Sequence, residues 1–305
     1  MKIKINLPRN ISSVMRKIGN IADANGLAVY LVGGCVRDIL LEVENLDLDI
    51  VVEGNALEFI KLLRSEIDLD VLTHPRFGTA TVTLPNGFKI DFTSARKENY
   101  AHPAALPSVT FSSINDDLFR RDFSINALAA KIDRSNFGQL LDLFEGQKDL
   151  KAARVRILHD QSFIDDPTRI VRAIRFAQRY NFRIESETLK LMRQAIASGL
   201  LKKISRFRLG REFILLLKEK QPLPAIELFD QLCGLKIIHP MIKLDKIAKA
   251  GLKARPAKSD WLVYFSLLTR KLNAEQLEKL CCDFCLTRID KRRLKALRSE
   301  GSILR

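Results

Sequence analysis

Two aspartates, Asp47 and Asp49, stand two residues apart within the segment Leu46–Val52. Side chains alternate between the faces of a strand, so both carboxylates would lie on one face, where they repel each other and are costly to bury. A hard cation such as Mg²⁺, which prefers carboxylate oxygens, would remove that cost. Asp91, in the segment Phe88–Phe92, offers a third ligand if the two strands pair. Taken alone the pattern is weak, because solvent-facing acids on an edge strand are a commoner reason for it.

A glycine pair, Gly33-Gly34, lies upstream of these aspartates, between the apolar segment Ala28–Val32 and the helical spacing of Val36–Leu41. Glycines let the backbone approach a ligand closely, and the N-terminus of a helix presents unsatisfied N–H groups to an anion. One loop could therefore hold a triphosphate while the next strand holds metal ions that bind the same phosphates. An ordinary strand-to-helix turn would use the same two glycines, so both interpretations stand at this point.

Asp166 and Arg169 form a candidate site for recognising a base. They are three residues apart, and the pattern predicts that they share one face of a helix over Phe163–Phe182. A carboxylate acceptor beside guanidinium donors matches the amino group and ring nitrogen of cytosine or adenine, and mismatches guanine and uracil. The alternative is an ion pair within the helix, which contributes only a few tenths of a kcal/mol at a surface.

The elements that would carry these residues alternate between strands and helices in the front half of the chain. The pattern predicts strands at Ala28–Val32, Leu46–Val52, Thr79–Leu84 and Phe88–Phe92, and helices at Ile11–Ala24, Val36–Leu41 and Ala56–Ser65. Pro85-Asn86-Gly87 predicts a hairpin between the third and fourth strands, so the sheet is mixed. In the back half only helices are predicted, at Phe163–Phe182, Ser186–Ala197, Arg208–Lys218, Pro224–Leu232, Trp261–Leu272 and Ala274–Cys281. The predicted fold class is an α/β N-terminal head, with a mixed sheet and flanking helices, followed by an all-α neck and body.

The charge of this 305-residue chain is unevenly distributed. Residues 1–150 hold 17 Lys and Arg against 20 Asp and Glu, a net charge of −3. Residues 151–305 hold 34 against 16, a net charge of +18. Basic surface of that size favours a polyanionic partner, nucleic acid first and an anionic membrane second. The alternative is a solvated helical surface with spare lysines.

Composition also bounds the environment of the protein. No apolar run approaches the roughly 18 residues of a membrane span, and the first ten residues lack the apolar core of a signal peptide. The 5 cysteines are odd in number and irregularly spaced, which argues against a secreted disulfide framework and for reduced thiols. We therefore expect a cytoplasmic protein with no membrane partner and no disulfide partner.

The segment Gly33-Gly34-Cys35-Val36-Arg37-Asp38, followed by Asp47-Leu48-Asp49, resembles the nucleotide-binding signature of a known family. That family is the tRNA nucleotidyltransferases and poly(A) polymerases, the class II branch of the polymerase-beta nucleotidyltransferase superfamily. Four later segments resemble the family's other motifs in the same order. They are Arg120–Leu128 (ribose and triphosphate), Asp142–Gly146 (hinge between head and neck), Asp165–Phe176 (pairing with the incoming base) and Ser205–Glu212 (neck stabilisation).

The resemblance implies a Mg²⁺-dependent enzyme that transfers a nucleotide to an RNA 3′-hydroxyl. Asp47 and Asp49, with Asp91 as the third catalytic carboxylate, would hold two Mg²⁺ ions, one activating the 3′-hydroxyl and one bridging the phosphates. The implied nucleotide-binding residues are Gly33, Gly34 and Arg37 for the triphosphate, Arg121, Asp122 and Asn126 for the triphosphate and ribose, and Asp166 and Arg169 for the base, with Arg172 and Arg175 in the same motif. The implied partners are ATP, CTP or both, and the tRNA 3′ acceptor end, which the basic body would bind through its backbone.

The resemblance also divides the chain into three parts. It implies a nucleotidyltransferase head at residues 1–149, a helical neck with the base-recognition motif at 150–215, and a basic, RNA-binding helical body at 216–305. Asp165 stands where the family usually has Glu, whereas Asp166 and Arg169 match the motif. About 90 residues follow the last motif, so we expect the helical tail that helps to hold the tRNA elbow to be short or missing.

Several activities share these motifs: addition of CCA, of CC only or of A only to tRNA, and addition of poly(A) to other RNA 3′ ends. The segment Ser94–Pro107 resembles the branch that includes enzymes adding only the terminal A, and it favours that activity. A metal-dependent glycosyltransferase would also use D-x-D, but it predicts neither the upstream glycine pair nor the basic helical body. A catalytically dead RNA-binding relative would be expected to have lost an acid of D-x-D or the glycine pair, and both are present.

Overall fold

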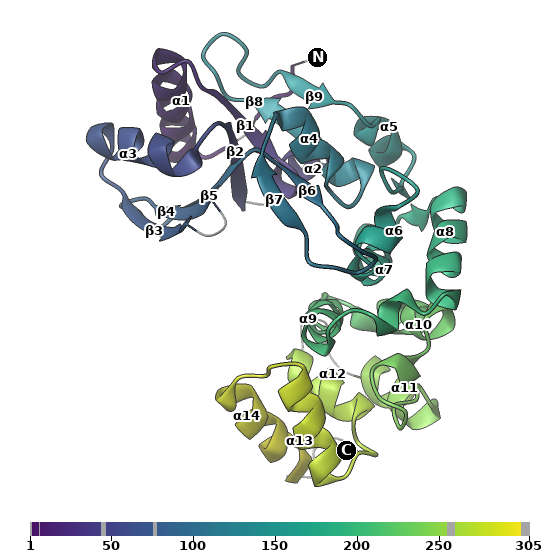
Figure 1. Ribbon diagram of the computed structural model, residues 1–305. Helices are drawn as coiled ribbons and strands as arrows, with labels where there is room; N and C mark the ends of the chain where they lie inside the picture. The colour runs from purple at the N-terminus through teal and green to yellow at the C-terminus, as the bar shows by residue number, and fades with distance from the viewer. Residues whose placement is uncertain (1, 6, 44–46, 76–77, 255–259, 300–305) are drawn as a thin grey trace. The chain divides into compact units, whose positions relative to one another are not determined.

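The computed structural model describes residues 2–5, 7–43, 47–75, 78–254 and 260–299 (Figure 1). The chain forms two compact units. The first unit consists of Met1–Ala101 and Pro107–Leu158, and the second of His102–Leu106 and His159–Arg305. Within the described residues, no helix is long and apolar enough to cross a membrane.

A mixed sheet of 7 strands forms the centre of the first unit, in the order β3-β4-β5-β2-β1-β8-β9 (Figure 1). Its strands are β1 (Ala28–Val32), β2 (Leu48–Glu53), β3 (Asp70–His74), β4 (Thr79–Thr83), β5 (Lys89–Ser94), β8 (Leu128–Lys131) and β9 (Leu140–Asp142). β2 and β5 run parallel, and the other neighbours run antiparallel. Outside this sheet, β6 (Arg96–Asn99) pairs with β7 (Ser108–Phe111), and β10 is Arg154–Val155.

Helices cover both faces of the central strands. The helical elements of this unit are α1 (Arg9–Ala24), α2 (Gly34–Leu40), α3 (Ala56–Glu66), α4 (Ile114–Phe119), the 3₁₀ turn η2 (Ser124–Asn126) and α5 (Gly146–Lys151). Phe92 of β5 is buried against Phe59 of α3, with ring centroids 6.3 Å apart. Val51 of β2 belongs to a buried cluster with Ile114 of α4. Because side chains alternate along β2, Asp49 shares the face of Val51.

The second unit is helical. Its elements are α6 (Ser162–Asp165), α7 (Thr168–Tyr180), β11 (Arg183–Ile184), α8 (Ser186–Ala197), η3 (Leu200–Lys202), α9 (Arg206–Leu217), α10 (Pro222–Leu232), η4 (Leu235–Ile237), α11 (Lys246–Lys253), α12 (Trp261–Leu268), α13 (Ala274–Asp283) and α14 (Arg288–Ser299). Phe213 of α9 packs against Phe229 of α10, with the two ring centroids 5.5 Å apart. A Cβ on Gly210 of α9 would come within 2.4 Å of the Phe284 ring, so a larger residue does not fit there.

The structure confirms the predicted fold class, with a mixed sheet and flanking helices followed by a helical region. The predicted hairpin at Pro85–Gly87 joins β4 to β5, which pair antiparallel. The single helix predicted at Phe163–Phe182 is wrong, because it is interrupted between α6 and α7. Pro167 disfavours a helical conformation in the residue before it, and Asp166 accordingly has φ −134° and ψ 93°. Leu46, the first residue of one predicted strand, lies outside the described residues.

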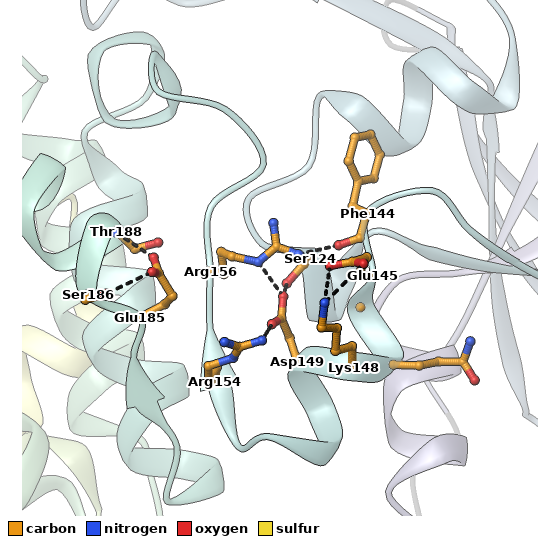
Figure 2. A network of polar contacts seen from close by, with 12 residues as sticks. Ser124, Phe144, Glu145, Lys148, Asp149, Arg154, Arg156, Glu185, Ser186 and Thr188 are labelled. Atoms are coloured by element: carbon orange, nitrogen blue, oxygen red, sulfur yellow. Dashed lines mark hydrogen bonds and ion pairs between the residues drawn. The ribbon is translucent and has the colours of Figure 1, made fainter.

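The start of α8 supports a prediction about stability and pH. The Glu185 carboxylate accepts hydrogen bonds from the N–H groups of Glu187, at 3.1 Å, and Thr188, at 2.8 Å. Figure 2 shows Glu185 beside Ser186 and Thr188. Burial raises the pKa of Glu185, but these backbone hydrogen bonds outweigh it and lower the pKa to about 2. Because the folded pKa lies below the ordinary value of 4.5, the stabilisation is present above pH 4.5 and is lost as the pH falls toward 2.

Glu185→Ala should therefore lower the free energy of unfolding by about 0.5–2 kcal/mol at pH 7, the usual cost of losing an N-cap. Urea denaturation should show that this difference shrinks as the pH is lowered below about 4.5. Glu187→Ala, which removes an exposed first-turn acid and its ion pair with Lys190 but leaves the Glu185 cap in place, is the matched control. An equal loss in both variants would contradict a capping role for Glu185.

Candidate functional site

The parallel pairing of β2 with β5 brings the predicted carboxylates together. Asp49 lies directly opposite Asp91 in the register, so their side chains share one face of the sheet. Asp47 stands one residue before β2 and is exposed, whereas Asp49 is partly buried. The Thr81 hydroxyl on β4 donates to Asp91 Oδ1 at 2.6 Å. The two strands therefore do pair, which is the condition for Asp91 to serve as a third ligand.

The electrostatics of this face are dominated by negative charge. Burial and then the charge of Asp47 raise the pKa of Asp49 to about 6, with Asp91 adding to the rise and the Arg121 guanidinium opposing it. The charges of Asp47 and Asp91 thus disfavour the charged form of Asp49 unless a cation binds nearby.

These carboxylates fit a magnesium ion that is bound jointly with a substrate. Within the described ranges, no group of three or more His, Cys, Asp or Glu side chains is arranged to hold a metal ion. Mg²⁺ requires fewer protein ligands than that, since one or two carboxylates commonly bind it together with substrate phosphates. Asp47 and Asp49 offer hard oxygen donors whose repulsion a cation would relieve.

Gly33 forms the turn between β1 and α2, with a φ of 68° in the left-handed region that favours glycine. A Cβ at this position would lie 2.5 Å from Arg121 Nη1, so the Arg121 guanidinium lies directly against the glycine backbone. Arg121 Nη2 also donates to Asp117 Oδ2 of α4 at 2.8 Å. Gly34, the first residue of α2, follows, and a Cβ on it would lie 3.4 Å from Arg37 Nη2. The glycine turn therefore leaves room for an arginine that also influences Asp49.

Arg37, Asp122 and Asn126 form one buried network. Arg37 is 4% exposed, and its Nε and Nη2 donate to the two carboxylate oxygens of Asp38 at 2.8 and 3.0 Å. Its Nη1 donates to Asn126 Oδ1. Asn126 Nδ2 donates in turn to Asp122 Oδ1 at 2.9 Å. The structure thus joins the glycine-pair motif to the predicted ribose and triphosphate motif, 89 residues apart at the Arg37–Asn126 contact.

Asp166 and Arg169 belong to the second unit, and the prediction that they share one helix face is wrong. Asp166 precedes α7, where its Oδ1 accepts from the Thr168 N–H at 3.0 Å and hydroxyl at 2.6 Å. Arg169 lies in the first turn of α7 and is 4% exposed. Pro167 breaks the helix between them. The Asp166 carboxylate therefore comes from the loop before α7, and the Arg169 guanidinium comes from the first turn of α7.

Arg208 of α9 is a partner of Asp166 that sequence reasoning missed. Its Nη2 donates to Asp166 Oδ1 at 2.7 Å, and its Nη1 donates to the Ala104 carbonyl at 3.0 Å. The only signal in the sequence is its place in the segment Ser205–Glu212, because the contact spans 42 residues. Arg208 and Thr168 together fix the orientation of the Asp166 carboxylate.

Arg172 and Arg175 of α7 lie near Glu212 of α9, with N–O distances of 3.6 Å in both pairs. Arg175 also lies 3.8 Å from Glu219 and is 6% exposed. Burial lowers the pKa of Arg175, and the charge of Glu212 opposes that change. The structure gives both arginines contacts between α7 and α9, and their predicted contact with a nucleotide stays a prediction.

Two family descriptions match consecutive parts of the sequence. Residues 29–156 match "Poly A polymerase head domain", and residues 181–245 match "Probable RNA and SrmB- binding site of polymerase A". An A-adding tRNA nucleotidyltransferase of Geobacter sulfurreducens is 38% identical over 308 residues, which cover 97% of this chain and 35% of the relative. An A-adding enzyme of Halalkalibacterium halodurans is 42% identical over 221 residues, covering 72% of this chain and 52% of the relative. The chain spans about a third to a half of the length of these curated relatives.

Solved structures share the fold over nearly the whole chain. A tRNA-processing enzyme in an apo form has a TM-score of 0.85 at 36% identity, covering 99% of this chain and 81% of that one. A CCA-adding enzyme of Thermotoga maritima complexed with tRNA has a TM-score of 0.79 at 34% identity, covering 96% of this chain and 70% of that one. On the combined evidence of its motifs, its matched domains and its fold, the chain belongs to the family of tRNA nucleotidyltransferases and poly(A) polymerases.

Proposed function

We propose that this protein adds the terminal A of the CCA end to tRNA, using ATP and releasing pyrophosphate. The observation that carries the proposal is the pairing of Asp49 with Asp91 on one face of the sheet. Arg121, which lies against the Gly33 turn, opposes the rise that burial causes in the pKa of Asp49 and so links this face to the glycine turn. The relative that matches 97% of the chain is named A-adding, and the segment Ser94–Pro107 favours the same activity. Addition of CC, or of the whole CCA end, is the alternative activity on the same tRNA substrate. It is kept because a CC-adding relative of Deinococcus radiodurans is 40% identical to this chain over 200 residues.

The first unit would supply the chemistry. Membership of a nucleotidyltransferase family implies a divalent metal ion. Asp47 and Asp49, with Asp91 beside them, would hold Mg²⁺, which when bound stabilises charge on the transferring phosphate as a Lewis acid. Arg121 would neutralise part of the triphosphate charge close to the Gly33 backbone.

The remaining contacts to the nucleotide would divide between sugar and base. Asp122 and Asn126 would orient the ribose, because the buried Arg37 network fixes their side chains. In the second unit, Asp166 would accept from the amino group of adenine and Arg169 would donate to its ring nitrogen. A carboxylate already oriented by neighbouring donors loses less entropy on binding the base.

The second unit would bind tRNA through its basic surface, since residues 159–305 hold 31 Lys and Arg against 16 Asp and Glu, a net charge of +15. Glu278 of α13 pairs with Lys291 and Lys295 of α14, which neutralises part of the positive charge of α14. Arg288 and Arg292 on the same helix are exposed. An enzyme acting on tRNA is inferred to work in the cytoplasm.

The double variant Arg288→Gln and Arg292→Gln should weaken tRNA binding and make it less sensitive to salt. Every phosphate that the variant no longer neutralises should reduce the slope of log affinity against log salt by about 0.7–0.9. Filter binding from low to moderate salt measures both the affinity and the slope. Arg64→Gln, at an exposed position on α3 of the first unit, is the control and should change neither. Equal effects of the double variant and the control would contradict this assignment of the tRNA surface.

Product length tests the proposal against the poly(A) alternative. With ATP and Mg²⁺, a tRNA ending in CC should gain one A and then stop, while an unstructured RNA of the same 3′ sequence should gain none. Runs of A on both RNAs would identify a poly(A) polymerase instead.

A further inference from the structure

Ser124 lies in the 3₁₀ turn η2, between the two residues proposed to orient the ribose, and is fully buried. Its hydroxyl donates to Asp149 Oδ2 at 2.6 Å, and its N–H donates to the Arg156 carbonyl at 2.9 Å. Figure 2 shows the Asp149 carboxylate between Ser124 and the two arginines Arg154 and Arg156. The hydroxyl and the N–H of Ser124 are therefore held by residues that lie 25 or more positions later in the chain.

Asp149 is a fully buried carboxylate, which is costly unless its charge is paired and hydrogen-bonded. Arg154 Nη2 lies 2.7 Å from Oδ1, and Arg156 Nε donates to Oδ2 at 2.7 Å. Arg156 Nη2 also donates to the Phe144 carbonyl, which ties the network to the loop before α5 (Figure 2). The acceptor offered to Ser124 is thus oriented by two guanidinium groups.

Gly146, at the start of α5, allows the close contact between α5 and the turn η2. A Cβ on Gly146 would lie 2.3 Å from the Ser124 carbonyl oxygen, so only glycine lets α5 reach η2. Asp142 fixes this end of the helix by accepting from the Gly146 N–H at 2.7 Å and the Gln147 N–H at 3.0 Å. The turn that holds Ser124 is therefore seated against a capped helix.

We infer that Asp149 is a positioning residue for the nucleotide site, acting through Ser124 on the turn that presents Asp122 and Asn126. A shift of Ser124 would move Asn126, whose amide binds Arg37 on one side and Asp122 on the other. This role rests on the proposed function, in which Asp122 and Asn126 orient the ribose. Asp149 itself contacts no part of the substrate.

Ser124→Ala tests the inference, because it removes the hydroxyl while Arg154 and Arg156 still pair with Asp149. The apparent KM for ATP and the Kd for ATP from calorimetry should both rise by about tenfold, the effect of removing one hydrogen bond to a charged group. The Kd for tRNA and kcat at saturating ATP should change by less than about twofold, because the hydroxyl orients the ribose turn only. Asp149→Asn should act in the same direction, and the double variant should be no worse than the more severe single variant.

Ser266→Ala is the matched control, since Ser266 is also fully buried and its Oγ has no hydrogen-bond partner among the described residues. It should leave the affinity for ATP unchanged. A lower Tm in Ser124→Ala with unchanged KM and Kd for ATP would reduce the network to a structural role and overturn the inference. Failure of the wild-type chain to bind ATP would instead contradict the proposed function, which keeps the two outcomes distinct.

Discussion

Asp49→Asn should abolish nucleotide transfer and, in the absence of metal, make the folded chain more stable. The carboxylate is partly buried beside Asp47 and opposite Asp91, so the fold bears a charge that Arg121 compensates only in part and that asparagine removes. The same substitution removes a hard oxygen ligand, and losing several kcal/mol of transition-state stabilisation lowers kcat by more than about a hundredfold. The melting temperature should rise by roughly 2–4 °C for each kcal/mol of repulsion relieved.

Radiolabelled ATP incorporation and calorimetry of the metal-free chain measure the two effects. Asp70→Asn, at an exposed position on β3 of the same sheet, should alter neither activity nor stability by a comparable amount. Substantial turnover by Asp49→Asn at saturating Mg²⁺ would remove this carboxylate from the mechanism. A lower melting temperature would show that Asp49 is a structural acid.

Arg169→Ala should reduce the discrimination between bases more than it reduces the rate of nucleotide transfer. Asp166 would still accept from an exocyclic amino group, because Thr168 and Arg208 hold its carboxylate in place. The donors to the ring nitrogen would be absent, and each polar group left unpaired in a buried site costs about 1–3 kcal/mol. Discrimination against UTP and GTP should therefore fall by at least about tenfold, while the carboxylates and the triphosphate contacts remain.

Misincorporation on a tRNA that ends in CC, measured together with the melting temperature, tests this expectation. Arg193→Ala, at an exposed position on α8 of the same unit, should leave nucleotide choice unchanged. Unchanged selectivity of Arg169→Ala with a lowered melting temperature would assign Arg169 and Asp166 to the scaffold.

The parts of the fold that follow local rules can be predicted from the sequence. Periodicity predicts Ala28–Val32 and Ser186–Ala197 with the bounds that β1 and α8 have, because the strand and helix patterns are uninterrupted there. The hairpin follows from its turn residues. The pairing of Asp49 with Asp91 is allowed by the sequence but is established only by the register of β2 and β5, which are separated in the chain by β3 and β4. In contrast, the helix break at Pro167 was missed. The proline is a local signal for the break, but the helical periodicity on both sides of it suggests one continuous helix.

The parts that depend on distant contacts could not be predicted. β8 and β9 are only four and three residues long, so neither shows a readable alternation, and the pairing of β8 with β1 places them. The contact of Arg208 with Asp166 spans 42 residues, and that of Ser124 with Asp149 spans 25. An isolated arginine or serine in a sequence carries no pattern that reveals such a partner.

The proposed activity is tested most directly with three forms of one tRNA: lacking the whole CCA end, lacking only the terminal A, and complete. Each is incubated with Mg²⁺ and either ATP or CTP, and the products are resolved to single nucleotides. We expect one nucleotide to be added to the tRNA lacking only the terminal A, from ATP alone, with one pyrophosphate released for each addition. Addition of C to the first tRNA, runs of A on any of them, or no transfer to any would contradict the assignment of this protein as an A-adding enzyme.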